Sequence, residues 1–249
     1  MSILGAVIVP HPPLIIPAVG RGLEQEVQTT IDAYRTVAKQ VAAWNPEVLI
    51  VTSPHQIMYA DYFHISPGRG ATGDMSAFGA AQTKLQVEYD EVLRDEIIRC
   101  GEAAGLQVGT LGQRDPYLDH GTFVPLYFLR EAGVDCPILR IGLSGFSPLD
   151  HYRLGQCIAQ AVETLGRRAV FIASGDLSHK LKDDGPYGFA PEGPEFDRQV
   201  TEAMAAGDFL RFLTMDLPLC ERAAECGLRS FQIMAGALDG RAVESKLLS

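Results

Sequence analysis

The sequence has no long apolar run and little positive charge. No stretch approaches the roughly 18 apolar residues that a membrane-spanning helix needs, so we expect no membrane partner and a cytoplasmic protein. Lys and Arg together number 21 against 31 Asp and Glu, which gives a formal net charge of −10. Because nucleic-acid binding depends on a concentrated basic surface, we expect no nucleic-acid partner. Small molecules and other proteins are the ligands that this composition favours.

Cysteine is also scarce. The five cysteines are odd in number and show no C-x-x-C spacing, which argues against a zinc ribbon and against a secreted disulfide framework. No internal repeat, low-complexity tract or linker-like segment divides the chain. We therefore expect one domain over residues 1–249.

Three short apolar segments each run into a histidine. The segments cover residues 3–9, 48–53 and 169–173, and the histidines that follow them are His11, His55 and His179. Continuous apolar residues without polar alternation predict strands that are buried on both faces, as in a parallel sheet. Ligands of open α/β sheets bind at the carboxyl ends of the strands. We therefore expect the three histidines to meet at one site.

The segments between these strands favour an α/β fold. Residues 24–44 carry apolar side chains at helical spacing and lead from the first strand to the second, which predicts a βαβ unit. The overall expectation is a single α/β domain with a central, mostly parallel or mixed sheet flanked by helices and a metal site at the strand ends. The glycine-rich residues 67–79 are expected to form a loop. Residues 246–249 resemble the start of a strand, so we expect the chain to be the N-terminal part of a longer protein.

The histidines suggest metal chemistry. Two imidazoles and one carboxylate form the facial triad of non-haem Fe(II) oxygenases, which leaves coordination positions open. A zinc hydrolase could use similar ligands, so the residues alone do not choose the metal. A serine hydrolase is less favoured, because no G-x-S-x-G motif is present. The carboxylate candidates are Glu225, Glu221, Asp176 and Glu195.

Five motifs, taken together, resemble a known family. They are Val9-Pro10-His11-Pro12-Pro13, Ser53-Pro54-His55, Asp119-His120-Gly121, Ser174-Gly175-Asp176-Leu177-Ser178-His179 and Glu225-Cys226-Gly227. In this order they resemble the class III extradiol ring-cleavage dioxygenase catalytic-subunit superfamily, the LigB-like proteins. Further similarity points to the branch associated with AMMECR1-type domains, with the Memo protein as a more distant relative.

The resemblance implies roles for particular residues. His11 and His55 match the metal-binding histidines of the family, and Glu225 matches its metal carboxylate. Memo-like relatives place a cysteine in this region, so Cys226 is an alternative third ligand. His120 and His179 match the catalytic acid–base histidines. Fe(II) is the metal that the resemblance implies first, with zinc or copper as alternatives.

The function implied by the resemblance is that of an Fe(II)-dependent extradiol-type dioxygenase. Its expected partners are a small catechol-like aromatic substrate and O₂, together with an AMMECR1-type domain, and a homo-oligomer is left open. His179 would serve as general base, and His120 or His179 would return the proton. The alternative is a Memo-like metal-binding redox or interaction protein without ring-cleavage activity.

Overall fold

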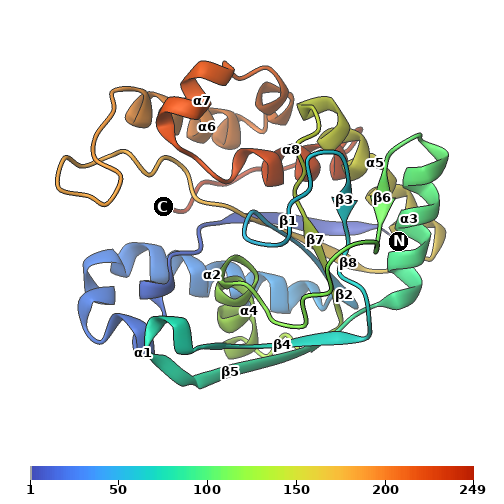
Figure 1. The fold of residues 1–249 in the computed structure, drawn as a ribbon, viewed down its shortest axis with the longest axis horizontal. Coiled ribbons are helices and arrows are strands. Elements are labelled where there is room, and N and C mark those ends of the chain that lie inside the picture. Colours follow the sequence, from blue (N-terminus) through green and yellow to red (C-terminus); the bar gives the residue numbers. More distant parts are fainter. Residues whose placement is uncertain (1) are drawn as a thin grey trace.

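A four-stranded parallel sheet lies at the centre of the protein in a computed structural model that describes residues 2–249 (Figure 1). Its strands follow the order β1-β8-β2-β7. Their bounds are Ile3–Val9 for β1, Val48–Ser53 for β2, Ile138–Gly142 for β7 and Ala169–Ser174 for β8. Every residue of β2, β7 and β8 is buried, as expected for strands covered on both faces. The predicted fold class, a single α/β domain, is confirmed.

Alternate residues of each strand contribute to two separate cores. Leu49 and Val51 of β2 pack with α2 (Gln28–Trp44) and α4 (His120–Glu131). Val48 and Ile50 pack on the opposite face with α3 (Glu91–Ala103), α5 (Pro148–Thr164), α6 (Glu192–Ala206) and α8 (Leu228–Ala237). This alternation follows from the two-residue period of a strand, which sends successive side chains to opposite faces. Figure 1 shows α2 and α4 on one side of the sheet and α5 to α8 on the other. The helices therefore cover both faces and leave the strand ends as the place for a site.

The longer helices agree with the sequence periodicity, and a side-chain cap starts α3, α4 and α5. The helices are α1 Pro17–Gly20, α2 Gln28–Trp44, α3 Glu91–Ala103, α4 His120–Glu131, α5 Pro148–Thr164, α6 Glu192–Ala206, α7 Leu217–Ala223 and α8 Leu228–Ala237. Short 3₁₀ turns cover Pro13–Ile15, Leu23–Val27, Ser76–Phe78 and Phe209–Leu213. No helix within residues 2–249 is long and apolar enough to cross a membrane.

Two expectations about the segments outside the central sheet were wrong. Residues 67–79 are not simply a loop, because β4 (Gly70–Met75) pairs antiparallel with β5 (Ala80–Glu88). Glycine at position 70 permits this pairing, since a Cβ there would lie 2.2 Å from the Val87 carbonyl oxygen. Residues 246–249 form no strand. A smaller parallel pair joins β3 (Phe63–His64) to β6 (Val108–Gly109).

His151 is buried in the first turn of α5 and is held neutral. Its Nδ1–H donates to the Ser147 carbonyl at 2.9 Å, and its Nε2 accepts from the Ser144 N–H at 3.4 Å. Burial lowers the pKa of His151 to about 4 and outweighs the hydrogen bond to Ser147, which raises this pKa. Of the nearby charges, Arg229 lowers the pKa further and Asp150 raises it. A proton on this ring would therefore destabilise the fold.

We predict that His151 makes the protein sensitive to acid. The unfolded chain takes up this proton near pH 6.5 and the folded one only near pH 4, so stability is complete above pH 6.5 and falls as the pH drops toward 4. At pH 4.5 the loss should be about 2.5 kcal/mol. Urea unfolding of the wild type and of His151→Gln at pH 7.5 and 4.5 measures the free energy of unfolding. The variant should lose less of this free energy on acidification than the wild type. Equal losses in the two proteins would contradict the prediction.

Candidate metal centre

The carboxyl ends of β1, β2 and β8 bring the predicted residues to one edge of the sheet. Val9 of β1 lies opposite Ser174 of β8, and Thr52 of β2 lies opposite Ala173. The chain leaves all three strands at the same level, so His11 and His55 follow directly at this edge. The His11 N–H donates to Asp176 Oδ1 at 2.8 Å, which ties the turn after β1 to the turn after β8.

The start of α4 supports the turn that follows β2. Asp119 caps the helix by accepting a hydrogen bond from the Thr122 N–H at 3.0 Å, as helix N-caps do. The same carboxylate oxygen also accepts from the Ser53 hydroxyl, at 2.5 Å. Ser53 Oγ in turn accepts from the His55 N–H at 3.2 Å. One capping carboxylate thus fixes both the helix that carries His120 and the turn that carries His55.

A second connection from α4 sets the tautomer of His11. The Ser174 hydroxyl donates to the Gly121 carbonyl at 2.6 Å, and Ser174 Oγ lies 2.9 Å from His11 Nδ1. Because the single hydroxyl proton is directed at Gly121, the oxygen can only accept from His11. This network places the imidazole proton on Nδ1 and leaves the Nε2 lone pair of His11 free, which is the form that binds a metal.

Position 121 requires glycine because the helix start approaches β2 closely. A Cβ on Gly121 would lie 2.4 Å from Ser53 Oγ and 3.1 Å from Asp119 Oδ1. Any larger residue would push apart the groups that align His55 and the helix cap. The Asp-His-Gly motif therefore combines a cap, a side chain for the site and a close backbone approach.

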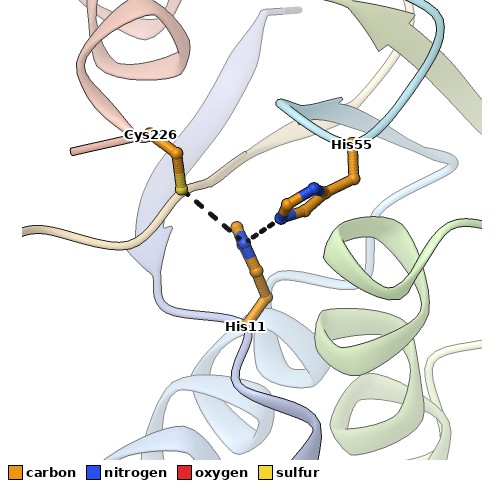
Figure 2. Close-up of side chains that lie close together, drawn as sticks. All are labelled: His11, His55 and Cys226. Atoms are coloured by element: carbon orange, nitrogen blue, oxygen red, sulfur yellow. Dashed lines mark hydrogen bonds between the residues drawn. The ribbon is translucent and has the colours of Figure 1, made fainter. Parts of the chain in front are cut away.

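Three potential metal donors surround His11 Nε2. His55 Nε2 lies 3.0 Å away, Asp176 Oδ2 3.6 Å and Cys226 Sγ 3.8 Å, and Figure 2 shows His55 and Cys226 on either side of His11. His11, His55 and Cys226 form one group able to hold a metal ion, while Asp176, His179 and Cys226 form another.

Burial lowers the pKa of His11 to about 4, against the raising effect of Asp176. Burial also lowers the pKa of His55. Neutral imidazoles beside a thiol and a carboxylate fit a divalent transition metal.

The side chains of the neighbouring residues Glu225 and Cys226 have different partners. The Glu225 carboxylate accepts a hydrogen bond from the Leu228 N–H at 2.7 Å at the start of α8, and burial raises the pKa of Glu225. Cys226 instead directs its Sγ toward His11. Among the described residues, Cys226 rather than Glu225 thus belongs to the donor groups. Which of the two ligates a metal stays a prediction.

Ala224 produces this arrangement through its backbone. It ends α7 in the left-handed conformation with φ of 53°, which costs roughly 1–2 kcal/mol for a residue with a Cβ. Strain of this kind persists where surrounding contacts enforce it, often at functional sites. Here the Ala224 carbonyl accepts from His179 Nδ1 at 2.5 Å, and the N–H groups of Cys226 and Gly227 both donate to the Asp176 carbonyl.

His179 belongs to the second donor group, with Asp176 and Cys226. Its Nδ1–H is used by Ala224, so its Nε2 is the nitrogen that faces the site, 3.5 Å from Asp176 Oδ2. Hydrogen bonds to Asp176 and then to Cys226 raise the pKa of His179 to about 11. Burial raises the pKa of Asp176, but its contacts with His179 and His11 outweigh burial and hold it below its ordinary value.

His120 lies on the other side of the cluster. Its ring is tilted by 33° against that of His55 with centroids 3.9 Å apart, and it lies 5.5 Å from the ring of His11. Burial, followed by the neighbouring His55, lowers the pKa of His120. The structure therefore brings all four predicted histidines together, with His120 and His179 flanking the other two.

Three supporting residues received no role from sequence reasoning: Ser53, Ser174 and Arg140. The Arg140 guanidinium is buried in β7 and donates to the carbonyls of Tyr117 and Asp115, which orders the segment before α4. The sequence does contain an indication of a role for Arg140, because it is a charged residue inside an apolar strand. The two serines end their strands, but their partners lie 66 and 53 positions away in the chain, so no local pattern indicated them.

The chain matches one protein family over nearly its whole length. Residues 5–249 match the family described as the catalytic LigB subunit of aromatic ring-opening dioxygenase. A crystal structure of an uncharacterized protein from Escherichia coli K12 has a similar fold, with a TM-score of 0.55 at 16% identity over 83% of this chain and 82% of that one. At this identity the match shows the fold alone.

Two curated relatives illustrate the range of similarity. A protein of Clostridium acetobutylicum is 34% identical over 256 residues, covering 100% of this chain and 55% of the relative. The 2,3-dihydroxyphenylpropionate/2,3-dihydroxicinnamic acid 1,2-dioxygenase of Escherichia coli strain 55989 is 28% identical over 169 residues, covering 63% of this chain and 51% of the enzyme. The chain thus spans about half the length of these relatives.

We predict that Ser174→Ala weakens metal binding by roughly 10- to 100-fold, the usual effect of removing a residue that orients a metal ligand. Without the serine oxygen, His11 can place its proton on either nitrogen. Competition with a chromophoric zinc chelator measures the affinity. The matched control is Ser230→Ala, which removes another fully buried hydroxyl, bonded to the Ser174 carbonyl; it should change stability more than metal affinity. Wild-type affinity in Ser174→Ala would contradict the prediction.

Proposed function

The chain belongs to the family of catalytic LigB subunits of aromatic ring-opening dioxygenases, and we propose that it is a metal-dependent extradiol-type dioxygenase that cleaves a catechol-like ring with O₂. The observation that carries the proposal is the convergence of four histidines at the strand ends, with the Nε2 atoms of His11 and His55 only 3.0 Å apart. Two further imidazoles beside such a pair are what a reaction with proton transfer requires.

The metal centre of the proposal uses His11 and His55 with a third ligand from Cys226, Asp176 or Glu225. Fe(II) fits the proposed reaction, and zinc or copper are the alternatives that a thiol donor favours. When bound, such a metal supplies Lewis-acid chemistry toward both hydroxyls of a catechol and, in the case of iron, redox chemistry toward O₂. The Ser174 contact orients the His11 imidazole for this role, and the Ser53 contact holds the turn that carries His55.

His120 and His179 are proposed to move the protons of the substrate. His179 presents only Nε2 to the site, because the Ala224 carbonyl fixes its Nδ1. Its partner Asp176 lies between His179 and His11, so a proton gained or lost by His179 is balanced by a nearby carboxylate. His120, stacked on His55, is positioned to exchange a proton from the opposite side.

A Memo-like metal-binding protein without ring cleavage is the second candidate. The observation that favours it is the position of Cys226, whose sulfur lies near His11 where a carboxylate is expected for an Fe(II) site. An AMMECR1-type partner and a homo-oligomer also stay predictions. The chain covers only 55% of the Clostridium acetobutylicum relative, which is compatible with a further domain in that protein.

We predict oxygen consumption with catechols after anaerobic loading with Fe(II). His120→Asn and His179→Asn should each lower the rate about 10²- to 10⁴-fold, since each removes a positioned proton-transfer group, while metal content stays near that of wild type. An oxygen electrode with a panel of catechols measures the rate, and metal analysis of each variant is the control. Absence of turnover with every catechol, combined with tight zinc or copper binding, would favour the second candidate.

We predict that Cys226 is the third ligand rather than Glu225. In protein loaded with Co(II), wild type should show a near-ultraviolet sulfur-to-cobalt charge-transfer band. Cys226→Ser should lose the band and bind metal more weakly, whereas Glu225→Gln should keep both and lose stability at the start of α8. Absence of the band in wild type, or weak metal binding confined to Glu225→Gln, would contradict the assignment to Cys226 and favour the carboxylate.

A further inference from the structure

Two aromatic side chains from separate loops contact the two outer histidines of the site. Phe78, at the tip of the β4–β5 hairpin, lies edge-on to His120 with ring centroids 5.5 Å apart and an interplanar angle of 69°. Tyr187, in the segment between β8 and α6, stacks on His179 at 4.9 Å and 28°. Neither Phe78 nor Tyr187 is itself a metal donor.

These two rings end a continuous row of contacts through the site. From Phe78 the row passes to His120, which stacks on His55, and from His55 to His11 through the 3.0 Å contact of their Nε2 atoms. Beyond His11 it continues through Asp176 and His179 to Tyr187. The donor atoms are thus in the middle of the row, with an aromatic ring at each end.

Both rings keep much of their surface free. Phe78 is 38% exposed and Tyr187 58% exposed, whereas the core aromatics Phe123 and Phe171 are fully buried. Neither belongs to the two cores of the domain. Single exposed aromatics are common on protein surfaces, so exposure alone carries no argument. Their shared contact with the site histidines is what distinguishes this pair.

Local contacts hold each ring in place. Arg21 donates from Nη2 to the Gly79 carbonyl at 2.6 Å, which fastens the hairpin tip next to Phe78. Gly79 has a φ of +78°, and a Cβ there would lie 2.7 Å from the same Arg21 atom. On the other side, the Gly188 N–H donates to the Gly185 carbonyl at 3.1 Å, closing a turn around Tyr187.

We propose that Phe78 and Tyr187 are specificity-determining residues that contact a planar aromatic ring bound at the metal centre and select it over non-aromatic chelators. The proposal rests on the proposed function, since it concerns the substrate of the same site. Aromatic rings attract each other in edge-on and offset-stacked arrangements. Each contact should therefore strengthen binding of an aromatic diol by about two- to tenfold and leave a chelator without a ring unaffected.

The test compares two chelating ligands on zinc-loaded protein, in which no turnover occurs. Isothermal titration calorimetry measures binding of 4-nitrocatechol, which has an aromatic ring, and of acetohydroxamate, which has none. Phe78→Leu and Tyr187→Leu should each weaken 4-nitrocatechol binding by about two- to tenfold and leave acetohydroxamate binding and zinc content unchanged. Tyr187→Phe keeps the ring and should bind like wild type. Leu149→Ala, an exposed position on α5, is the control for unspecific effects.

The outcomes separate this proposal from the proposed function. Equal 4-nitrocatechol affinity in wild type, Phe78→Leu and Tyr187→Leu would overturn the proposal, even if catechols are cleaved. Weakening of both ligands alike, or loss of affinity in Tyr187→Phe, would also overturn it, because the effect would then come from the metal or from the hydroxyl. Ring-dependent binding without oxygen consumption by the iron-loaded wild type would support it and contradict ring cleavage. Absence of 4-nitrocatechol binding by wild type would overturn both.

Discussion

The hydrogen bond from the Ser174 hydroxyl to the Gly121 carbonyl is the contact on which the site depends most. It commits the only hydroxyl proton of Ser174 to α4, so that the oxygen must accept from His11 Nδ1. A backbone carbonyl in the first turn of one helix thereby decides which nitrogen of a histidine 110 positions earlier in the chain carries its lone pair toward the site. Ser53, which donates to Asp119, accepts from the backbone N–H of His55. The same helix start therefore orients the His11 ring and holds the turn that carries His55.

This arrangement explains how the candidate metal centre forms from the ends of a parallel sheet and the first residues after each strand. The strands are buried on both faces, which makes their ends rigid, and their register brings the ends to one level. Burial favours neutral imidazoles at His11 and His55. A single carboxylate, Asp176, lies beside His179, raises the pKa of this imidazole and balances its positive charge. The backbone therefore determines which atoms can bind a metal and which side chains carry charge before any ligand binds.

The sequence predicted the parts of the structure that depend on short-range patterns. The apolar strands, the helix after β1 and the histidines after the strands all follow from residue order, because strand burial and proline turns act within a few residues. The orientation of residues 225 and 226 did not follow in this way. It depends on the left-handed backbone of Ala224 and on the contacts of Asp176 with two N–H groups from a distant loop. The pairing of β4 with β5 was missed because its glycines, which suggest a loop, also permit close approach of strands.

The two parts of the site therefore differ in how freely they can change. His11, His55 and their serine partners are tied to strand ends and to α4, so a substitution there disturbs several contacts at once. Phe78 and Tyr187 lie in loops whose outer surfaces face solvent, and each touches the centre through one histidine only. Loops of this kind carry specificity while the scaffold carries chemistry. Under the proposed function, proteins of this fold that share His11 and His55 can accept different ligands through changes confined to such loops.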